Sequence, residues 1–210
     1  MPQRNQMAIK NQYEKAYKQI RHQLITQEIP CGERLTEQQW ARKLEVNRAD
    51  IRQALARLFA EGLLENGEKG GFFARTYSPQ DVDEINEARL LLEIGAARLA
   101  IERAQENDIA DLEQTCEHMT LMAQNSYYLG VYEADLRFHK QLVNAAHNTK
   151  LSQIYNLANI PLLPGLITAD TTNTKENLIR TANEHSQMVS ALRQKDAEKL
   201  IELLINGLKK

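Results

Sequence analysis

Residues 32–73 restrict the fold of this chain more than any other segment, because they encode two short helices, a tight turn and a ribbon. Thr36 is expected to cap the first helix, with Gln39 at the third helical position as its partner in a capping box. Leu35 and Trp40 lie on either side of that cap, at the positions of a hydrophobic staple. These residues together predict a sharply defined helix start.

A second helix follows after a turn of a few residues. Asn47 is a suitable N-cap with Asp50 at the third helical position, and Gly62 is a typical helix stop. An apolar stripe at helical spacing is formed by Ile51, Leu55 and Leu58. A different face therefore carries Arg48, Ala49 and Arg52. This arrangement predicts a helix-turn-helix, in which the first residues of the second helix read base edges in DNA.

The flanking segments complete a small domain. An amphipathic helix over residues 13–27 is indicated by the spacing of Tyr13, Tyr17, Ile20 and Leu24. Residues 63–65 and 72–74 are expected to pair as a hairpin, because the turn between them is rich in Asn and Gly. The sequence therefore predicts a winged helix-turn-helix at about residues 8–76.

This segment resembles the winged helix of GntR-type bacterial transcription regulators. The resemblance rests on Gly32, Arg34–Leu35, Leu44, Val46–Asn47–Arg48, Ile51 to Leu55, Leu58, Glu61–Gly62–Leu63 and Gly70. The chain departs from the usual sequence pattern of that family at four positions. It has Cys31 in place of proline, Glu45 in place of glycine, Asn47 in place of serine and Gln53 in place of glutamate. The resemblance implies a regulator of transcription that binds double-stranded DNA.

Arg48 and Arg52 lie one helical turn apart and are the first candidates for DNA contact. One of them is expected to fork onto O6 and N7 of a guanine while the other clamps a phosphate. The alternative is a solvated pair of side chains bonded to Asp50 or Glu45. The remaining DNA-contact candidates are Asn47, Ala49, Arg34, Gln38, Lys69 and Gly70.

These remaining candidates have different expected partners. Arg34 and Gln38 are expected to touch the DNA backbone. Lys69 and Gly70 lie at the tip of the wing and are expected to reach the minor groove, since glycine allows a close approach. An ordinary hairpin turn is the alternative at that tip.

The charge is distributed unevenly although the net charge is only −2. Residues 1–76 carry 13 basic and 9 acidic side chains, whereas residues 77–210 carry 13 basic and 19 acidic ones. This division fits a DNA-binding head on a body that stays away from phosphates. No apolar run is long enough for a membrane span, and Cys31 and Cys116 lack metal-type spacing. We therefore expect a cytoplasmic protein with reduced thiols.

Residues 79–210 are expected to form a helical domain, in which Ser78 caps the first helix ahead of Pro79. Six helices are expected at about residues 79–101, 108–128, 132–146, 150–160, 175–194 and 197–209. The expected breaks are Gly130, His147–Asn148, Pro161 to Gly165, and Lys195–Asp196. The predicted fold class is all-α with a small β wing, an N-terminal winged helix-turn-helix followed by a C-terminal six-helix bundle.

The helical part resembles the FCD effector-binding domain of the FadR branch, and it looks closer to the VanR-like group than to the acyl-CoA-responsive FadR. The resemblance rests on short motifs, Glu87–Ala88–Arg89, Glu93, Asp135 to His139, Ala145 to Asn148, Glu184–His185 and Lys195 to Ala197. It implies a bundle around a polar pocket that frequently holds a metal, and a homodimer built largely by this domain.

Asp135 and His139 are candidate metal ligands because they lie four residues apart on one helix face. A carboxylate oxygen and a neutral imidazole suit zinc, nickel or manganese. Such a pair alone is more often a surface hydrogen bond, but His185 in the Glu-His motif favours a ligand set. Arg89 is a candidate for binding an effector carboxylate, with an ion pair to Glu93 as the alternative.

The FCD resemblance also implies a third histidine near the end of the final helix, and that position is Gly207 in this chain. Glycine has no side chain to act as a ligand, so three protein ligands remain. We therefore expect a weakly held or absent metal, and a retained pocket in which these residues and Arg89 bind a small-molecule effector.

The sequence thus predicts a sequence-specific transcriptional regulator, with repression favoured over activation, on a near-palindromic operator. Two other classes are a metal-dependent helical-bundle enzyme and a protein-only interaction module with a degenerate winged helix. The enzyme class is disfavoured because the sequence has no HExxH motif, no pair of Glu-x-x-His motifs and no phosphate-binding glycine loop. Duplex binding in a gel shift with a salt titration separates the three classes.

Overall fold

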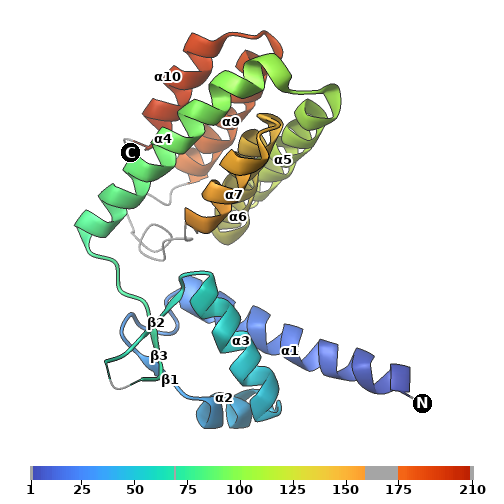
Figure 1. Cartoon of the computed structure of the whole chain (residues 1–210), viewed down its shortest axis with the longest axis vertical. Helices are drawn as coiled ribbons and strands as arrows, with labels where there is room; N and C mark the ends of the chain where they lie inside the picture. The colour runs from blue at the N-terminus through green and yellow to red at the C-terminus, as the bar shows by residue number, and fades with distance from the viewer. Residues whose placement is uncertain (1, 69, 159–174, 209–210) are drawn as a thin grey trace. The chain divides into compact units, whose positions relative to one another are not determined.

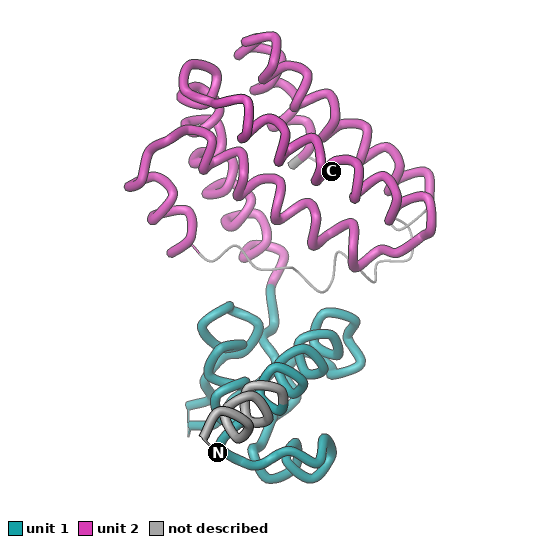
Figure 2. The backbone as a smooth tube through the Cα atoms, turned by 90° about the vertical axis from the view of Figure 1, so that its right-hand side faces the viewer, with its two compact units in different colours: residues 1–77 teal, residues 78–210 magenta. Residues whose placement is uncertain are grey.

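The computed structural model describes residues 2–68, 70–158 and 175–208. The chain divides into two compact units, residues 1–77 and 78–210, which Figure 2 shows in teal and magenta. Each unit buries apolar side chains of its own. None of the helices in the described ranges has both the length and the apolar character needed to cross a membrane.

The first unit is a winged helix built from short elements (Figure 1), namely α1 (Pro2–Ile25), β1 (Arg34–Leu35), α2 (Glu37–Leu44), α3 (Arg48–Ala60), β2 (Leu64–Asn66) and β3 (Phe72–Ala74). Its sheet is antiparallel, with β3 between β1 and β2. The pairing of Leu64 with Ala74 confirms the predicted wing. The sequence did not predict β1, because two residues are too few to show a strand periodicity.

The helix boundaries around the turn follow the predicted caps. The Thr36 hydroxyl accepts a hydrogen bond from the Gln39 amide at 3.2 Å, and the Asn47 side chain accepts one from the Asp50 amide at 2.9 Å. Gly62 has a φ of +75° just after α3, as a helix stop requires. A cap of this kind contributes about 1 kcal/mol to stability. Together these features fix where α2 and α3 begin and where α3 ends.

Packing of α1, α2 and α3 forms the core of the first unit. Its largest side chains are no more than 1% exposed, and they are Ile20, Ile25, Trp40, Ile51, Leu55, Leu58 and Leu64. Burying a side chain of this size stabilises the fold by roughly 1.5–3 kcal/mol. Because α3 turns its apolar stripe towards this core, its opposite face, which includes Arg48, Ala49 and Arg52, remains exposed to solvent.

The second unit is a helical bundle (Figure 1) that contains α4 (Pro79–Arg103), α5 (Glu106–Gln124), α6 (Tyr128–Ala145), α7 (Thr149–Ala158), α9 (Lys175–Arg193) and α10 (Ala197–Leu208). Helix α5 packs against α6 and α9, and α10 packs against α4 and α9. Apolar side chains of these five helices form one continuous core. The break predicted at Pro161 to Gly165 lies outside the described residues.

One predicted break in this unit is wrong. The helix expected to reach Tyr128 ends at Gln124, and α6 begins at Tyr128. The chain reverses at Ser126, which has a φ of +54°, whereas Gly130 lies inside α6. A Cβ atom at Gly130 would clash with the ring of Tyr127. Glycine is therefore needed at this position for close packing and does not end a helix.

Candidate DNA-reading helix and metal pocket

Arg48 and Arg52 lie in the first two turns of α3, with 65% and 67% of their side chains exposed. Arg52 donates from Nε and Nη2 to the two carboxylate oxygens of Glu37 at 2.6 and 3.0 Å. Nη2 of Arg48 lies 3.5 Å from Oε2 of the same carboxylate. The anionic partner of both arginines is therefore the first residue of α2, which the sequence analysis did not identify.

The other DNA-contact candidates are spread over the same unit. All of those that the structure describes are exposed, including Gln38, Ala49 and Gly70. Arg34 is exposed on β1, with its guanidinium 5.9 Å from the ring centroid of Phe73. The amide oxygen of Asn47 is engaged in capping α3. Lys69 lies outside the described residues, and the contacts of all these positions with DNA remain predictions.

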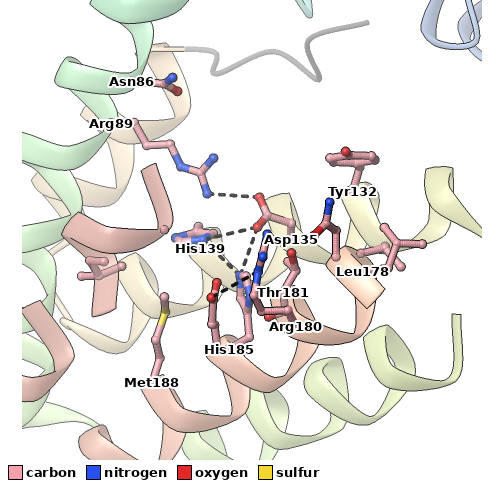
Figure 3. A pocket seen from close by; sticks show the side chains of 15 residues that line it. Asn86, Arg89, Tyr132, Asp135, His139, Leu178, Arg180, Thr181, His185 and Met188 are labelled. Carbon is pink, nitrogen blue, oxygen red and sulfur yellow. Dashed lines mark hydrogen bonds and ion pairs between the residues drawn. The ribbon is translucent and has the colours of Figure 1, made fainter. Parts of the chain in front are cut away.

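The second unit encloses a cavity of about 290 Å³ between α4, α6, α9 and α10 (Figure 3). Its innermost polar side chains are Arg89 from α4, Asp135 and His139 from α6, and His185 from α9. Apolar side chains cover other parts of its wall, among them Val131, Leu178, Met188 and Leu204. This volume is at the lower end of the range for small-ligand sites, roughly 300–1,000 Å³. The cavity therefore fits a small metabolite.

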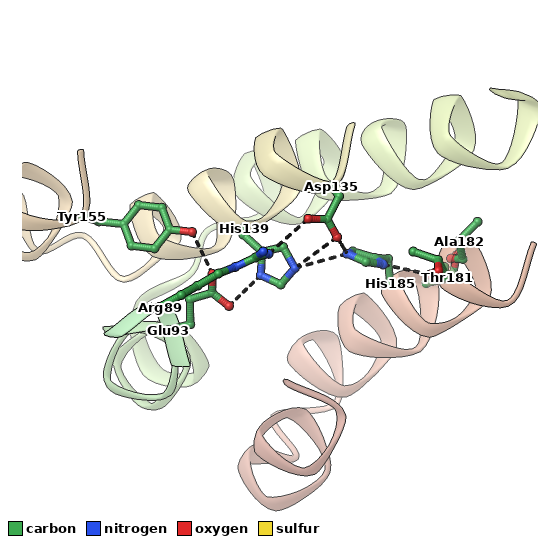
Figure 4. A network of polar contacts seen from close by, with 9 residues as sticks. Arg89, Glu93, Asp135, His139, Tyr155, Thr181, Ala182 and His185 are labelled. Atoms are coloured by element: carbon green, nitrogen blue, oxygen red, sulfur yellow. Dashed lines mark hydrogen bonds and ion pairs between the residues drawn. The ribbon is translucent and has the colours of Figure 1, made fainter. Parts of the chain in front are cut away.

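Asp135, His139 and His185 bring three electron-pair donors to one point (Figure 4). Nε2 of His185 lies 3.0 Å from Oδ1 of Asp135 and 3.3 Å from Nε2 of His139, and the latter nitrogen lies 3.6 Å from Oδ1 of Asp135. A tetrahedral ion with bonds of about 2.0–2.1 Å has its ligand atoms about 3.3 Å apart. The three predicted ligands therefore have the separation that a divalent ion requires.

Partners on the far side of each imidazole favour the tautomer that a metal needs. Nδ1 of His185 lies 2.8 Å from the Thr181 carbonyl oxygen, which places the proton on that nitrogen. Nδ1 of His139 lies 2.7 Å from Oε2 of Glu93, an ion pair by distance although its angle is too bent for a good hydrogen bond. With the proton on Nδ1, Nε2 of each imidazole has its lone pair available for a divalent ion beside Asp135.

Glu93 links the ligands to the surrounding helices and is completely buried. Its Oε1 accepts hydrogen bonds from Nε of Arg89 and from the hydroxyl of Tyr155, each at 2.7 Å. Nη2 of Arg89 also donates to Oδ2 of Asp135 at 3.2 Å. The ion pair between Arg89 and Glu93, the alternative considered for Arg89, is therefore present, and a second carboxylate shares the same guanidinium (Figure 4).

The ion pairs in this pocket outweigh the cost of burying charge. Burial acts to raise the pKa of Glu93, but His139 and Arg89 lower it to about 2. The pKa of Asp135 is held well below its usual value, because Arg89 and His139 overcome the opposing effect of burial. Burial and Arg89 act to lower the pKa of His139, yet Glu93 and Asp135 raise it above its ordinary value. A proton and a metal therefore compete for this imidazole.

Gly207 lines the same cavity from α10. A Cβ atom added there would meet Cε of Met188 at 3.8 Å, which is an ordinary van der Waals contact. The α10 wall therefore has room for a larger side chain at the position where the FCD resemblance implies a third histidine.

The two units together define a class of protein, a DNA-reading winged helix joined to a helical domain with a ligand pocket. Residues 12–74 match the family described as bacterial regulatory proteins of the gntR family, and residues 84–209 match the FCD domain. The chain therefore belongs to the GntR family of bacterial transcriptional regulators, in the branch that carries an FCD effector-binding domain. This result confirms the resemblances to the GntR winged helix and to the FCD domain, and the relatives of the chain are named as transcriptional regulators.

Several known proteins are similar to this chain. The regulator YdhC of Bacillus subtilis is 30% identical over 148 residues, 70% of this chain and 66% of its own length. The Nta operon transcriptional regulator of Aminobacter aminovorans is 36% identical over 57% of each chain, and the galactonate operon transcriptional repressor of Escherichia coli is 30% identical over 58% of this chain and 52% of its own. Each match thus spans less than two thirds of the relative.

A solved structure shares the overall fold. Escherichia coli McbR/YncC superimposes with a TM-score of 0.75 at 21% identity, over 94% of this chain and 93% of its own. At that identity the likeness supports the winged helix and the helical bundle, and nothing finer.

Proposed function

We propose that this chain is a repressor that binds near-palindromic DNA as a homodimer and loses affinity for it when a small carboxylate effector enters the pocket. The observation that carries the proposal is the combination of exposed arginines at the start of α3 with a pocket of three converging acceptors. One relative is named a galactonate operon repressor, and galactonate is a small hydroxy acid. Effector binding then acts as a population shift between states of different DNA affinity.

Arg52→Ala is expected to weaken binding to the preferred duplex by roughly 5- to 150-fold and to relax base preference at one position of each half-site. Arg48→Ala is expected to weaken binding to all sequences alike, because a phosphate contact carries no sequence information. The measurement is duplex binding by the full chain, with a site first selected from a pool of random-sequence duplexes.

The matched control for these variants is Arg193→Ala, which removes an ion-paired arginine from the second unit. It should leave duplex affinity unchanged. If Arg48→Ala and Arg52→Ala both remain folded and bind the selected duplex as tightly as the wild type, α3 does not read DNA.

The charges of the pocket support a metal-dependent response to an anion. Arg89 is already held by the carboxylates of both Glu93 and Asp135, so its positive charge is matched before an effector arrives. A further carboxylate placed beside Asp135 is repelled by it unless a cation lies between them. A divalent ion, when held by Asp135, His139 and His185, supplies the positive charge that an effector carboxylate binds. Arg180 and Glu184 at the same cavity lie 3.9 Å apart and offset each other.

Gly207→His is expected to tighten metal binding by at least about tenfold, because it restores a fourth protein ligand to a three-ligand site. A Cβ atom at this position meets Met188 only at an ordinary contact distance, so the backbone accepts a side chain there without a clash at its first atom. The measurement is zinc affinity by competition with a chromophoric chelator. Gly207→Gln, which is of similar size, is the control and should not tighten binding. Equal zinc affinity in the histidine variant and the wild type would show that position 207 does not face the ion.

A homodimer is proposed because one recognition helix contacts only a few base pairs. The second unit exposes large apolar side chains on two helices that pack together, Leu91 on α4 and Ile154 and Leu157 on α7. Exposed apolar side chains of this size are typical of protein–protein contacts, and we propose that a second copy of the chain buries them. A two-fold dimer requires the duplex selected from the random pool to be an inverted repeat.

A further inference from the structure

Glu37 places an acidic side chain against both arginines that are candidates for DNA contact. It is the first residue of α2 and lies beside the N-terminal turns of α3. Its own side chain is only 23% exposed, whereas those of Arg48 and Arg52 are about two thirds exposed. The Glu37 carboxylate thus binds the two guanidinium groups while both arginine side chains remain largely exposed to solvent.

The geometry of the contact leaves part of Arg52 available. A guanidinium has five N–H groups, and Glu37 engages those of Nε and one on Nη2, at 2.6 and 3.0 Å. The parallel fork formed by Nη1 and the other N–H of Nη2 has no partner among the side chains that the structure describes. That fork is the one that pairs with O6 and N7 of guanine. Holding Arg52 from its side is therefore compatible with base reading by its tip.

We propose that Glu37 is a positioning residue that sets the sequence specificity of this regulator. It orients Arg52 before DNA arrives, which reduces the rotamer freedom that a flexible arginine loses on binding. It also removes one positive charge from the pair of arginines, and this lowers their attraction for phosphates of any sequence. The first effect favours the matched site, and the second disfavours all other sites.

The test rests on the proposed function and uses the full chain with a duplex selected from a random-sequence pool and with a scrambled duplex of equal length. Glu37→Gln keeps the size of the side chain but removes its charge and the second oxygen that accepts a hydrogen bond from Arg52. The scrambled duplex should bind several-fold more tightly to this variant, and the ratio of selected to scrambled affinity should fall at least about tenfold. The dependence of log affinity on log salt should steepen by about one unit.

Two further variants separate this role from a purely structural one. Glu28→Gln makes the same charge change in the same unit at a carboxylate that contacts Thr26 and His22, and it should leave the affinity ratio unchanged. If Glu37 acts partly by orienting Arg52, the double variant Glu37→Gln/Arg52→Ala should lose less specificity than the sum of the losses in the two single variants. Thermal melting of each variant checks that the head is folded.

The outcomes distinguish this inference from the proposed function. Failure of the wild type to select any duplex would overturn the proposed function itself. A wild type that selects a site, together with a folded Glu37→Gln variant that keeps both the affinity ratio and the salt slope, would overturn the role of Glu37 alone. Additive losses in the double variant would also overturn it, because Glu37 would then act independently of Arg52.

Discussion

Replacing His185 with alanine is expected to reduce the affinity for a divalent metal by more than about 100-fold. Loss of a residue that only hydrogen-bonds to a metal ligand lowers metal affinity by about 10- to 100-fold, and loss of the ligand itself costs more. His185 contributes the nitrogen that lies closest to both other ligand atoms, 3.0 Å from Asp135 and 3.3 Å from His139. The two remaining ligands cannot surround an ion. Elemental analysis of protein purified without an affinity tag or chelator measures the effect.

The matched control is His147→Ala, since His147 contacts the carboxylate of Asp108 at 2.7 Å and does not line the cavity. This control should retain the metal content of the wild type. The proposed response to anions gives a second readout, because small hydroxy acids should raise the melting temperature of the metal-loaded wild type and not that of His185→Ala. Stoichiometric metal in His185→Ala would place the ion elsewhere in the chain.

Features that depend on near neighbours in the chain could be predicted from the sequence. The caps at Thr36 and Asn47 each involve a partner three residues away, and the structure shows both. Asp135 and His139 were paired by their spacing of four residues, and they do lie together. His185, in contrast, was added to this set through the family resemblance, because nothing in its spacing from the other two predicts proximity.

Contacts between distant segments could not be predicted in this way. Glu37 and Arg52 are 15 residues apart, and Glu93 and Tyr155 are 62 residues apart. A glutamate in an amphipathic helix has the same local pattern whether it is solvated or, like Glu93, completely buried. Gly130 has a different explanation, because the Tyr127 ring that a Cβ atom there would meet lies only three residues away, and a glycine alone does not show whether it ends a helix or allows close packing inside one.

The family resemblance explains one backbone feature that local rules would not. Glu45 stands where the GntR text has glycine, and its φ of +54° lies in the left-handed region that favours glycine. A side chain in that region costs about 1–2 kcal/mol. The turn between α2 and α3 therefore keeps the geometry of the family despite the substitution, and it does so at the expense of stability.

Arg89→Ala is expected to lower the free energy of unfolding by about 3–5 kcal/mol, the usual result of removing one partner from a buried ion pair. Arg89 is 9% exposed and is held by Glu93 at 2.7 Å and by Asp135 at 3.2 Å. Without it, two carboxylates share a pocket in which His139 is the nearest cation. Urea denaturation at neutral pH, with a chelator present to remove metal, measures the loss.

Two comparisons identify the cause of this loss. Arg89→Lys keeps the charge but cannot contact both carboxylates as a fork does, so it should lose less stability than the alanine variant. Arg180→Ala removes a half-exposed arginine from the same cavity and should change stability by less than about 1 kcal/mol. Restoring a divalent ion should stabilise Arg89→Ala more than the wild type, because the ion offsets the unpaired carboxylates. A wild-type unfolding free energy in Arg89→Ala would mean that the buried carboxylates do not need a guanidinium.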